Sequence, residues 1–325
     1  MGPAVGRAAL TVNAIEVRGL VKRYRGAAVN AVDGICFDVP DGQFFCLLGP
    51  NGAGKTTTVS ILTTTLSPTS GRVRIAGRDL SAQQALIRRD IGIVFQQPSL
   101  DANLTAEENI RAQAVLYGLY PWRPLYRMMP SGYRRQVCDL AGVLGIADAL
   151  GRPARSLSGG MRRKLEIVRA LMHRPRVLFL DEPTAGLDPE SRRSLWAYLR
   201  QARARYDTTV VLTTHYLGEA ETADAVCVMA HGRIIEHGSP AEVKSRHASP
   251  ALIVDAADRA ALRRELAGLG LRQVTDADGR GLRVALGGRN AHSVLRAIEL
   301  DLTHVRTVEP TLEEAYLMLL DHPER

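Results

Sequence analysis

Short apolar runs, separated by glycine, proline and polar residues, recur along the first part of the chain. Runs of this kind predict β-strands. We expect strands at residues 15–20, 34–39, 43–48, 72–75 and 91–95. A helix is predicted at residues 56–66, directly behind a glycine-rich loop. A strand, a loop and a helix therefore follow one another near residue 50.

Helical spacing of the apolar residues replaces this pattern at residues 105–119 and 134–144, which predicts an inserted helical subdomain at about 100–160. Helices and strands then alternate. The expected helices are residues 160–172, 189–205 and 217–223, and the expected strands are 176–180, 209–213, 226–229 and 233–238. Such alternation predicts an α/β fold with a mainly parallel sheet.

The order of elements changes after residue 244. Strands are predicted at 252–254, 272–275, 282–286 and 303–308, with helices at 259–269 and 291–298 between them. The resulting order, β-α-β-β-α-β, is that of a ferredoxin-like domain. A last helix is expected at 311–320. We therefore predict a flexible tail at 1–13, a main domain at 14–244 and an accessory or regulatory domain at 245–325.

Composition narrows the class of protein. The 325 residues are 46% hydrophobic, yet no run approaches the roughly 18 apolar residues of a membrane-spanning helix. Residues 1–14 resemble neither a signal peptide nor a myristoylation site. The four scattered cysteines favour reduced structural thiols. The net charge of +8 is compatible with nucleic acid, with anionic lipid or with arginines spread over solvated faces, and we favour the last.

A phosphate-binding loop is the most specific motif. The pattern G-x-x-x-x-G-K-[ST] is matched by Gly49, Pro50, Asn51, Gly52, Ala53, Gly54, Lys55 and Thr56, with Thr57 next. Its glycines let backbone N–H groups converge on phosphate at a helix N-terminus. Lys55 is expected to meet the β- and γ-phosphates of ATP, and the Thr56 hydroxyl to bind Mg²⁺. The preceding strand and following helix make a chance glycine-rich turn a poor alternative.

Two adjacent carboxylates follow a later apolar strand. Asp181 and Glu182 lie at the carboxyl end of the strand at 176–180, where ligands of open α/β sheets bind. Asp181 suits Mg²⁺ coordination, and Glu182 is a candidate general base for the attacking water. Taken alone, the pair could also be an ordinary turn at a strand end.

A third motif stands between these two, formed by Leu157, Ser158, Gly159, Gly160 and Met161. By itself it could be only a helix N-cap. The phosphate loop, the Ser-Gly-Gly motif and the carboxylate pair, in this order, resemble those of the ABC ATPases. The resemblance is specifically to the subunits of bacterial exporters with a separately encoded permease, of the daunorubicin-resistance and nodulation-factor export type. The similarity spans about residues 15–243, and the segment 309–313 also resembles that branch. It implies a P-loop ABC ATPase domain with an antiparallel β portion beside the mainly parallel sheet.

The resemblance also assigns roles to single residues. It makes Tyr24 the aromatic that stacks on adenine, Gln96 a γ-phosphate sensor that also binds Mg²⁺ and His215 a switch histidine. Asp188 belongs to a loop, beginning at Ala185 and Gly186, that communicates between paired subunits. Without the resemblance, Tyr24 could be a half-buried residue at a strand end, and His215 a core or turn residue.

The resemblance implies partners as well. ATP and Mg²⁺ are the expected cofactors, and Ser158 is expected to act in trans, on ATP held by a second copy or a homologous subunit. An integral-membrane permease, encoded as a separate chain, would hold the protein at the cytoplasmic face of the membrane. Four aromatic residues after Gln96 are either helical-subdomain core or part of a groove for that permease: Tyr117, Tyr120, Trp122 and Tyr126.

The main rival is a non-transport ABC ATPase that acts on nucleic acid or the ribosome. Repair members of that class insert a long coiled coil before the Ser-Gly-Gly motif, and ribosome-associated members carry two ATPase domains. The interval here is short, and one domain is present. A GTPase is disfavoured because no Asn-Lys-x-Asp motif follows the phosphate loop. The sequence does not identify the transported substrate.

Overall fold

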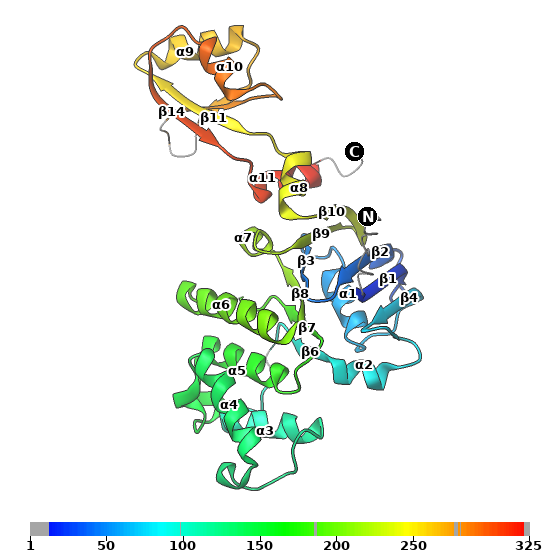
Figure 1. The fold of residues 1–325 in the computed structure, drawn as a ribbon. Helices are drawn as coiled ribbons and strands as arrows, with labels where there is room; N and C mark the ends of the chain where they lie inside the picture. The colour runs from blue at the N-terminus through cyan, green and yellow to red at the C-terminus, as the bar shows by residue number, and fades with distance from the viewer. Residues whose placement is uncertain (1–12, 98, 185–186, 276–278, 280, 322–325) are drawn as a thin grey trace, which may run out of the picture. The chain divides into compact units, whose positions relative to one another are not determined.

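A computed structural model describes residues 13–97, 99–184, 187–275, 279 and 281–321 (Figure 1). The contacts between residues divide the chain into two compact units, Met1–Ile235 and Glu236–Arg325. The fold class agrees with the expectation from sequence. The tail predicted at 1–13 lies, apart from residue 13, outside the described residues.

A small antiparallel sheet begins the first unit. Its strands are β1 (Asn13–Lys22), β2 (Val32–Pro40), β4 (Ser70–Ile75) and β5 (Arg78–Asp79), in the order β2-β1-β4-β5. Side chains alternate across it, as expected for a sheet with one covered face. Ile15 and Val17 are buried, whereas Arg18 points outward and forms an ion pair with Asp38.

The central sheet has six strands in the order β10-β9-β3-β8-β7-β6. They are β3 (Phe44–Leu48), β6 (Ile91–Val94), β7 (Val177–Asp181), β8 (Thr209–Thr214), β9 (Ala225–Ala230) and β10 (Arg233–Gly238). The pairs β3/β8, β3/β9, β6/β7 and β7/β8 are parallel. All residues of β3, β7, β8 and β9 are buried, as is typical of parallel strands covered on both faces. The carboxyl ends of these strands therefore share one edge.

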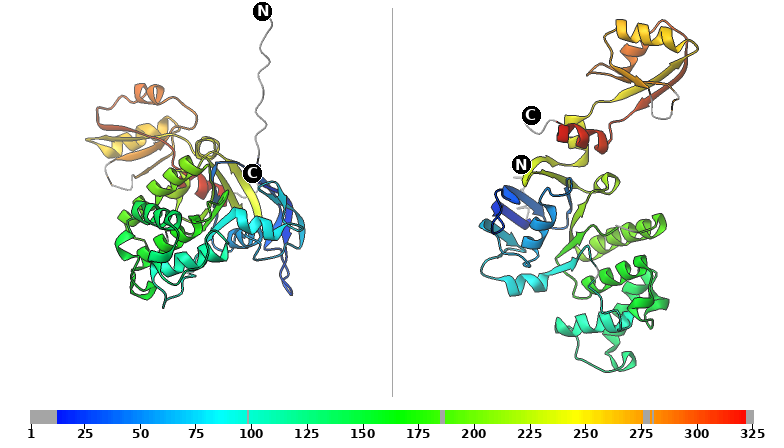
Figure 2. Two further views of the ribbon diagram at one scale, coloured as in Figure 1. Left: turned by 60° about the horizontal axis from the view of Figure 1, so that its bottom comes forward. Right: turned by 180° about the vertical axis from the view of Figure 1, so that it is seen from behind.

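Helices surround this sheet and form a cluster beside it (Figure 2). They are α1 (Lys55–Leu62), α2 (Gln84–Asp90), α3 (Ala106–Leu116), α4 (Ser131–Val143), α5 (Gly159–Leu171), α6 (Pro189–Tyr206) and α7 (Leu217–Ala220). Three 3-10 turns lie at Tyr126–Met128, Ala147–Ala149 and Ala154–Ser156. Within the cluster, α5 packs against both α3 and α4.

Several predicted helices end early in the structure, and two of them, α1 and α3, stop near residues with a positive φ. The helix predicted to reach residue 66 stops at Leu62, and Thr64 then adopts a positive φ of 61°. The helix predicted to reach residue 119 stops at Leu116, because Gly118 takes a φ of 67° that helices do not contain. Both stops coincide with left-handed residues.

The second unit contains an antiparallel sheet in the order β12-β13-β11-β14. Its strands are β11 (Ala251–Ala256), β12 (Gln273–Thr275), β13 (Leu282–Ala285) and β14 (Leu302–Val308). Helices α9 (Arg259–Gly268) and α10 (Ala291–Arg296) complete the predicted β-α-β-β-α-β order. Leu252, Val254 and Leu266 belong to the core of this unit.

Two helices, α2 and α8 (Pro240–His247), were not predicted from the sequence. Helix α8 packs against the last helix, α11 (Leu312–Asp321). The signal for α8 was present in the sequence. Ser239 and Glu242 form a reciprocal capping box, and Pro240 occupies the first turn. Because α8 belongs to the second unit, that unit begins before residue 245.

Candidate functional site

The loop between β3 and α1 packs closely against neighbouring backbone at two of its glycines. Gly54 has a φ of 101°, and a Cβ added there would lie 2.5 Å from the carbonyl oxygen of Ala31. A Cβ at Gly49 would collide with the carbonyl oxygen of Met229. Glycine is therefore required at both positions for steric reasons. The loop leads directly into the N-terminus of α1, a favourable place for phosphate.

Lys55 is folded back onto this loop. Its Nζ donates to the carbonyl oxygens of Gly49 at 2.7 Å and of Pro50 at 3.0 Å, and the residue is only 6% exposed. Burial lowers the pKa of Lys55, and the charges of Glu182 and Asp181 oppose that shift. A lysine held by carbonyl groups next to a glycine loop is suited to bind phosphate oxygens.

Tyr24 lies beside the phosphate loop. Its hydroxyl is 3.3 Å from the Oγ1 of Thr57, and its ring is 46% exposed. Lys22 Nζ lies 5.5 Å from the ring centroid. The adenine-stacking role and the alternative of a half-buried residue at a strand end are both compatible with this exposure. Thr56, next to Thr57, is exposed at the start of α1.

Asp181 ends β7 as a buried carboxylate, only 5% exposed. It accepts a hydrogen bond from the hydroxyl of Thr213 in the neighbouring strand β8. Burial raises the pKa of Asp181, while the Thr213 hydrogen bond lowers it. The parallel register of β7 and β8 pairs these two residues directly, so the sheet orients the carboxylate.

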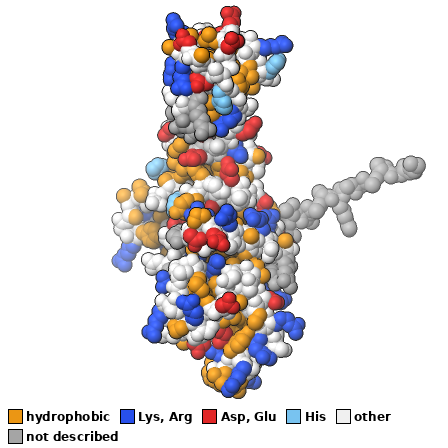
Figure 3. Space-filling view, turned by 90° about the vertical axis from the view of Figure 1, so that its left-hand side faces the viewer, with side chains coloured by type: hydrophobic (Ala, Val, Ile, Leu, Met, Phe, Trp, Pro, Cys, Tyr) orange, Lys and Arg blue, Asp and Glu red, His pale blue; other side chains and the backbone are white. Residues whose placement is uncertain are grey.

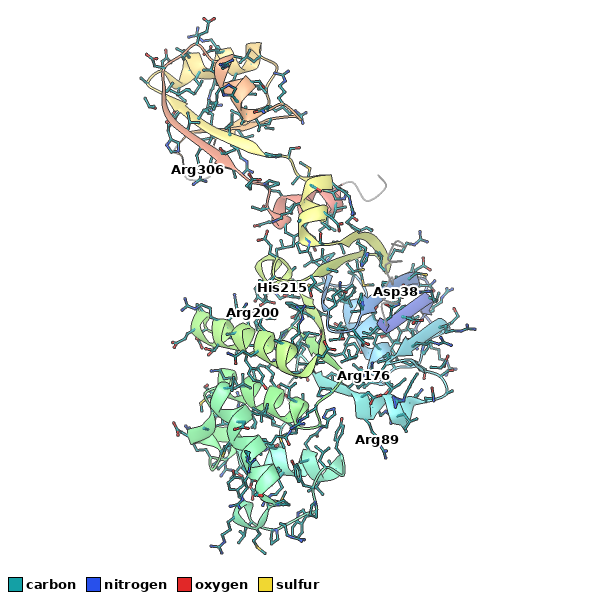
Figure 4. The ribbon with its side chains drawn as sticks, in the orientation of Figure 1. Asp38, Arg89, Arg176, Arg200, His215 and Arg306 are labelled. Carbon is teal, nitrogen blue, oxygen red and sulfur yellow. The ribbon has the colours of Figure 1, made fainter. Side chains whose placement is uncertain are left out.

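Three residues predicted from the sequence, Gln96, Glu182 and His215, lie together directly after the end of β7. Glu182 Oε2 accepts a hydrogen bond from Gln96 Nε2 at 3.1 Å, and its Oε1 lies 3.1 Å from Nδ1 of His215. Glu182 adopts a φ of 46°, which is unfavourable for a residue with a side chain. Its N–H donates to the carbonyl oxygen of Thr213 at 3.0 Å, which holds this conformation. Figure 4 labels His215 at the end of β8.

The donor types at this edge fit Mg²⁺ and nucleotide phosphates. The Thr56 hydroxyl, the Asp181 carboxylate and the Gln96 amide oxygen are hard oxygen ligands, and Mg²⁺ commonly completes its shell with phosphate and water. In the part of the chain that the structure describes, no hydrogen bond links Thr56 to Asp181. The backbone N–H groups of the glycine loop and the Lys55 ammonium are the donors that a phosphate chain requires.

The Ser-Gly-Gly motif lies at the start of another helix, apart from the phosphate loop. Ser158 caps α5, and its Oγ accepts a hydrogen bond from the N–H of Met161 at 3.2 Å. Leu157 is buried, whereas Ser158 and Gly159 are exposed. A Cβ added to Gly160 would lie 3.4 Å from Ser191 Oγ, near the start of α6.

Asp188 caps α6 through a hydrogen bond from the N–H of Ser191 at 2.8 Å. That backbone hydrogen bond lowers the pKa of Asp188. Ala185 and Gly186 of the same predicted loop lie outside the described residues. The starts of α5 and α6 are therefore close, and both offer polar, exposed residues.

The sequence analysis assigned no role to Arg163, which the structure places at the centre of a buried network. Its guanidinium donates to the carbonyl oxygens of Pro183 at 3.0 Å and Asp181 at 2.7 Å, and also to that of Phe95. It pairs with Glu166 at 3.2 Å. Burial lowers the pKa of Arg163, which is 7% exposed. One side chain thus ties the segment before Gln96 to the strand end that carries Glu182.

Comparisons with known proteins agree with this geometry. The family model described as "ABC transporter" matches residues 32–185. The daunorubicin/doxorubicin resistance ATP-binding protein DrrA of Streptomyces peucetius is 39% identical over 95% of this chain and 93% of its own length. The Nod factor export ATP-binding protein I of Ralstonia nicotianae is 40% identical over 74% of this chain and 71% of its own length.

Solved structures give the same result. An ATP-binding subunit of an ABC transporter superposes with a TM-score of 0.63 at 28% identity, over 71% of this chain and 92% of its own. A dimeric ATP-binding cassette with ADP and phosphate bound has a TM-score of 0.62 at 25% identity, over 69% of this chain and 98% of its own. With the glycine cradle, the carboxylate pair and the Ser-Gly-Gly helix, these similarities show that the chain belongs to the ABC transporter family, as an ATP-binding subunit that uses Mg²⁺ and hydrolyses ATP.

Proposed function

We propose that this subunit drives the export of an amphiphilic molecule, such as a drug-like compound, a lipid or a polyketide, through a separately encoded permease. The observation that carries this proposal is the convergence of Gln96, Glu182 and His215 beside the phosphate loop. The names of the relatives, which refer to drug resistance and to export, support the direction of transport. In the described part of the chain, no helix has the length and apolar character needed to cross a bilayer.

In the proposed mechanism, Glu182 is the general base. Its carboxylate is only 15% exposed and is held by two neighbours, so its orientation toward a water molecule is restricted. His215 and Gln96 position that water and respond to the γ-phosphate. Lys55 and the loop N–H groups bind the phosphates. Thr56, Asp181 and Gln96 would hold Mg²⁺, which would supply positive charge opposite the phosphates. Tyr24, which is 46% exposed, stacks on the adenine.

We further propose that each site is completed by a second copy of this chain or a homologous subunit. Ser158, with the N–H groups that follow it, would close over the γ-phosphate held by the partner. The arrangement within one chain supports this, because α5 packs on α3 and α4 whereas α1 packs on β7. Asp188 would then lie at the boundary between the two subunits.

A groove in the first unit is the proposed docking site for the permease. It is a cavity of about 460 Å³ whose lining includes Thr63, Thr65, Phe95 and Tyr117. Phe95 immediately precedes Gln96, so movement in the groove would reach the catalytic edge directly. Tyr117 stacks on His173 with ring centroids 4.2 Å apart. We assign the second unit a regulatory role, and we place the subunit at the cytoplasmic face of the membrane through its permease.

Reconstitution tests the proposal. The subunit would be combined with the multi-span membrane protein encoded next to its gene, in inverted vesicles to which an amphiphilic fluorescent dye is added from outside. We expect ATP-dependent accumulation of the dye in the lumen with the wild-type chain and none with Glu182→Gln. Accumulation that proceeds equally with Glu182→Gln, or movement out of inverted vesicles, would contradict the assignment.

A further inference from the structure

The segment that links α3 to α4 sorts its side chains onto two faces. On the inner face, Tyr120 OH donates to Gln136 Oε1 at 3.1 Å, and Tyr126 OH donates to the carbonyl oxygen of Arg134 at 3.3 Å. Both rings pack edge to face on the buried Tyr133, with centroids 5.4 and 6.2 Å apart. Met129 is also buried. These contacts fix the segment to the helical cluster.

The outer face carries large apolar side chains at every third position. Leu119 is 37% exposed, Trp122 63%, Leu125 46% and Met128 52%, and Leu116 at the end of α3 is 81% exposed. The anchoring contacts of the inner face hold these five residues outward. Apolar side chains gathered in one exposed segment mark an interaction surface more often than isolated ones do. We call residues 116–128 the apolar loop.

The charged residues of the apolar loop and of the segment that follows it, up to residue 138, are all basic. Between residues 116 and 138 the sequence contains no aspartate or glutamate. It contains four arginines, all exposed: Arg123, Arg127, Arg134 and Arg135. Among the described residues, none of the four takes part in a salt bridge. Figure 3 shows hydrophobic and basic side chains together at the end of the first unit where this segment lies.

We propose that the apolar loop is a membrane-surface anchor that binds anionic lipid headgroups. Trp122 suits the boundary between headgroups and acyl chains, and Leu119, Leu125 and Met128 add apolar area to that contact. The four arginines are complementary to an anionic leaflet. A protruding, basic and apolar surface matches lipid better than it matches a folded protein partner, which would need acidic groups opposite each arginine.

The anchor lies beside the proposed permease groove, because Tyr117 lines that groove and Leu116 begins the loop. Contact with lipid would therefore favour the orientation in which the groove faces the membrane. The inference goes beyond the proposed function because it requires no permease.

Vesicle binding by the full chain, without permease, tests the anchor. The chain has two tryptophans, so Trp196→Phe leaves Trp122 as the only indole reporter. Vesicles of phosphatidylcholine are compared with vesicles that also contain phosphatidylglycerol. We expect co-sedimentation and a blue shift of Trp122 fluorescence with the anionic vesicles, both weakened by salt.

Variants then distinguish vesicle binding through the apolar loop from vesicle binding through basic residues elsewhere on the protein. The double change Trp122→Ser with Leu125→Ser should weaken binding by about tenfold. Changing the four arginines to glutamine should weaken it further, by about fivefold for each residue. The matched controls, Leu317→Ser with Met318→Ser and a glutamine set at Arg89, Arg200, Arg264 and Arg296, should bind as the wild type does. ATP turnover should remain unchanged in every variant.

The proposal would be overturned if the wild-type protein did not bind anionic vesicles, or if the control variants lost as much binding as the loop variants. If the wild type does not bind vesicles and the loop variants also lose their complex with the permease in detergent, the loop is a protein interface. Neither outcome depends on whether the chain exports a substrate, so failure of the anchor and failure of the proposed export can be distinguished.

Discussion

The central sheet and the C-terminal sheet use similar elements but organise their strand ends differently. In the central sheet, the pairs β3/β8, β3/β9, β6/β7 and β7/β8 are all parallel. The phosphate loop, Gln96, Glu182 and His215 all follow such strands and therefore reach one edge. In the C-terminal sheet, β11 pairs antiparallel with β13 and β14, and β12 with β13, so neighbouring carboxyl ends point in opposite directions.

The strands of the two sheets also differ in how deeply they are buried. Every residue of β7 and β8 is buried, whereas β14 is exposed or half-buried along its whole length. A parallel sheet covered on both faces can hold a carboxylate such as Asp181 away from water at its edge. The C-terminal sheet has one apolar core and no comparable edge among its described residues. The comparison teaches that strand direction, more than composition, decides where a catalytic site can form.

Loss of the proposed base should have the largest effect. Glu182→Gln preserves the shape of the side chain but removes its basicity. We expect ATP turnover to fall by about 10²- to 10⁴-fold, with ATP affinity nearly unchanged. Lys55→Ala is the contrasting variant, because it should weaken nucleotide binding itself. Steady-state turnover and equilibrium binding would be measured for both, and near wild-type turnover in each would refute the assignment of the site to this edge.

Arg163 tests whether buried polar contacts hold the catalytic edge together. Arg163→Ala removes a donor from three carbonyl oxygens and the cationic partner of the buried Glu166, which keeps its hydrogen bond from the N–H of Ser99. We expect the free energy of unfolding to fall by about 3 kcal/mol. The neighbouring Arg162, which is partly exposed, provides the control, with an expected change within about 0.5 kcal/mol for Arg162→Ala. Urea denaturation of both variants would show similar losses if the network contributed little.

Mixed dimers test whether Ser158 of one chain completes the nucleotide site of a second chain. In a Glu182→Gln background, a Lys55→Ala subunit is paired with a Ser158→Ala subunit. If Ser158 acts in trans, one composite site holds both defects and the other holds none, so one Mg-ATP should be trapped per dimer. Pairing the double mutant with an otherwise intact subunit places one defect in each site, and no trapping is expected. Equal trapping in the two mixtures would exclude composite sites.

Removal of the second unit should have the smallest effect on nucleotide binding. The chain would end after Gly238, which keeps β10 and avoids cutting α8. ATP affinity should change by less than about threefold, since none of the proposed phosphate-site residues lies beyond His215. Fluorescence titration with an ATP analogue measures this. A shortened chain that folds, as judged by circular dichroism, but does not bind nucleotide would show that the catalytic edge depends on the second unit.

Much of the fold could be predicted because its signals are local. The glycines of the phosphate loop, the apolar strand before Asp181 and the β-α-β-β-α-β order all lie within short stretches of sequence. The ends of helices were predicted less well, since Thr64 and Gly118 end helices through left-handed conformations that apolar spacing does not reveal. Helix α8 was missed because its short apolar pattern is weak, although its capping box is explicit.

The sequence by itself determined which residues can do chemistry: a lysine in a glycine loop, two carboxylates at a strand end, a glutamine and a histidine. Their combination was decided only by the tertiary structure, because Gln96, Glu182 and His215 come from three strands that are separated along the chain and adjacent in the sheet. The same holds for Arg163, whose position in a basic helix resembles that of its partly exposed neighbours Arg162 and Lys164. Only packing against the ends of β6 and β7 turns it inward, where desolvation requires every N–H group to find a partner.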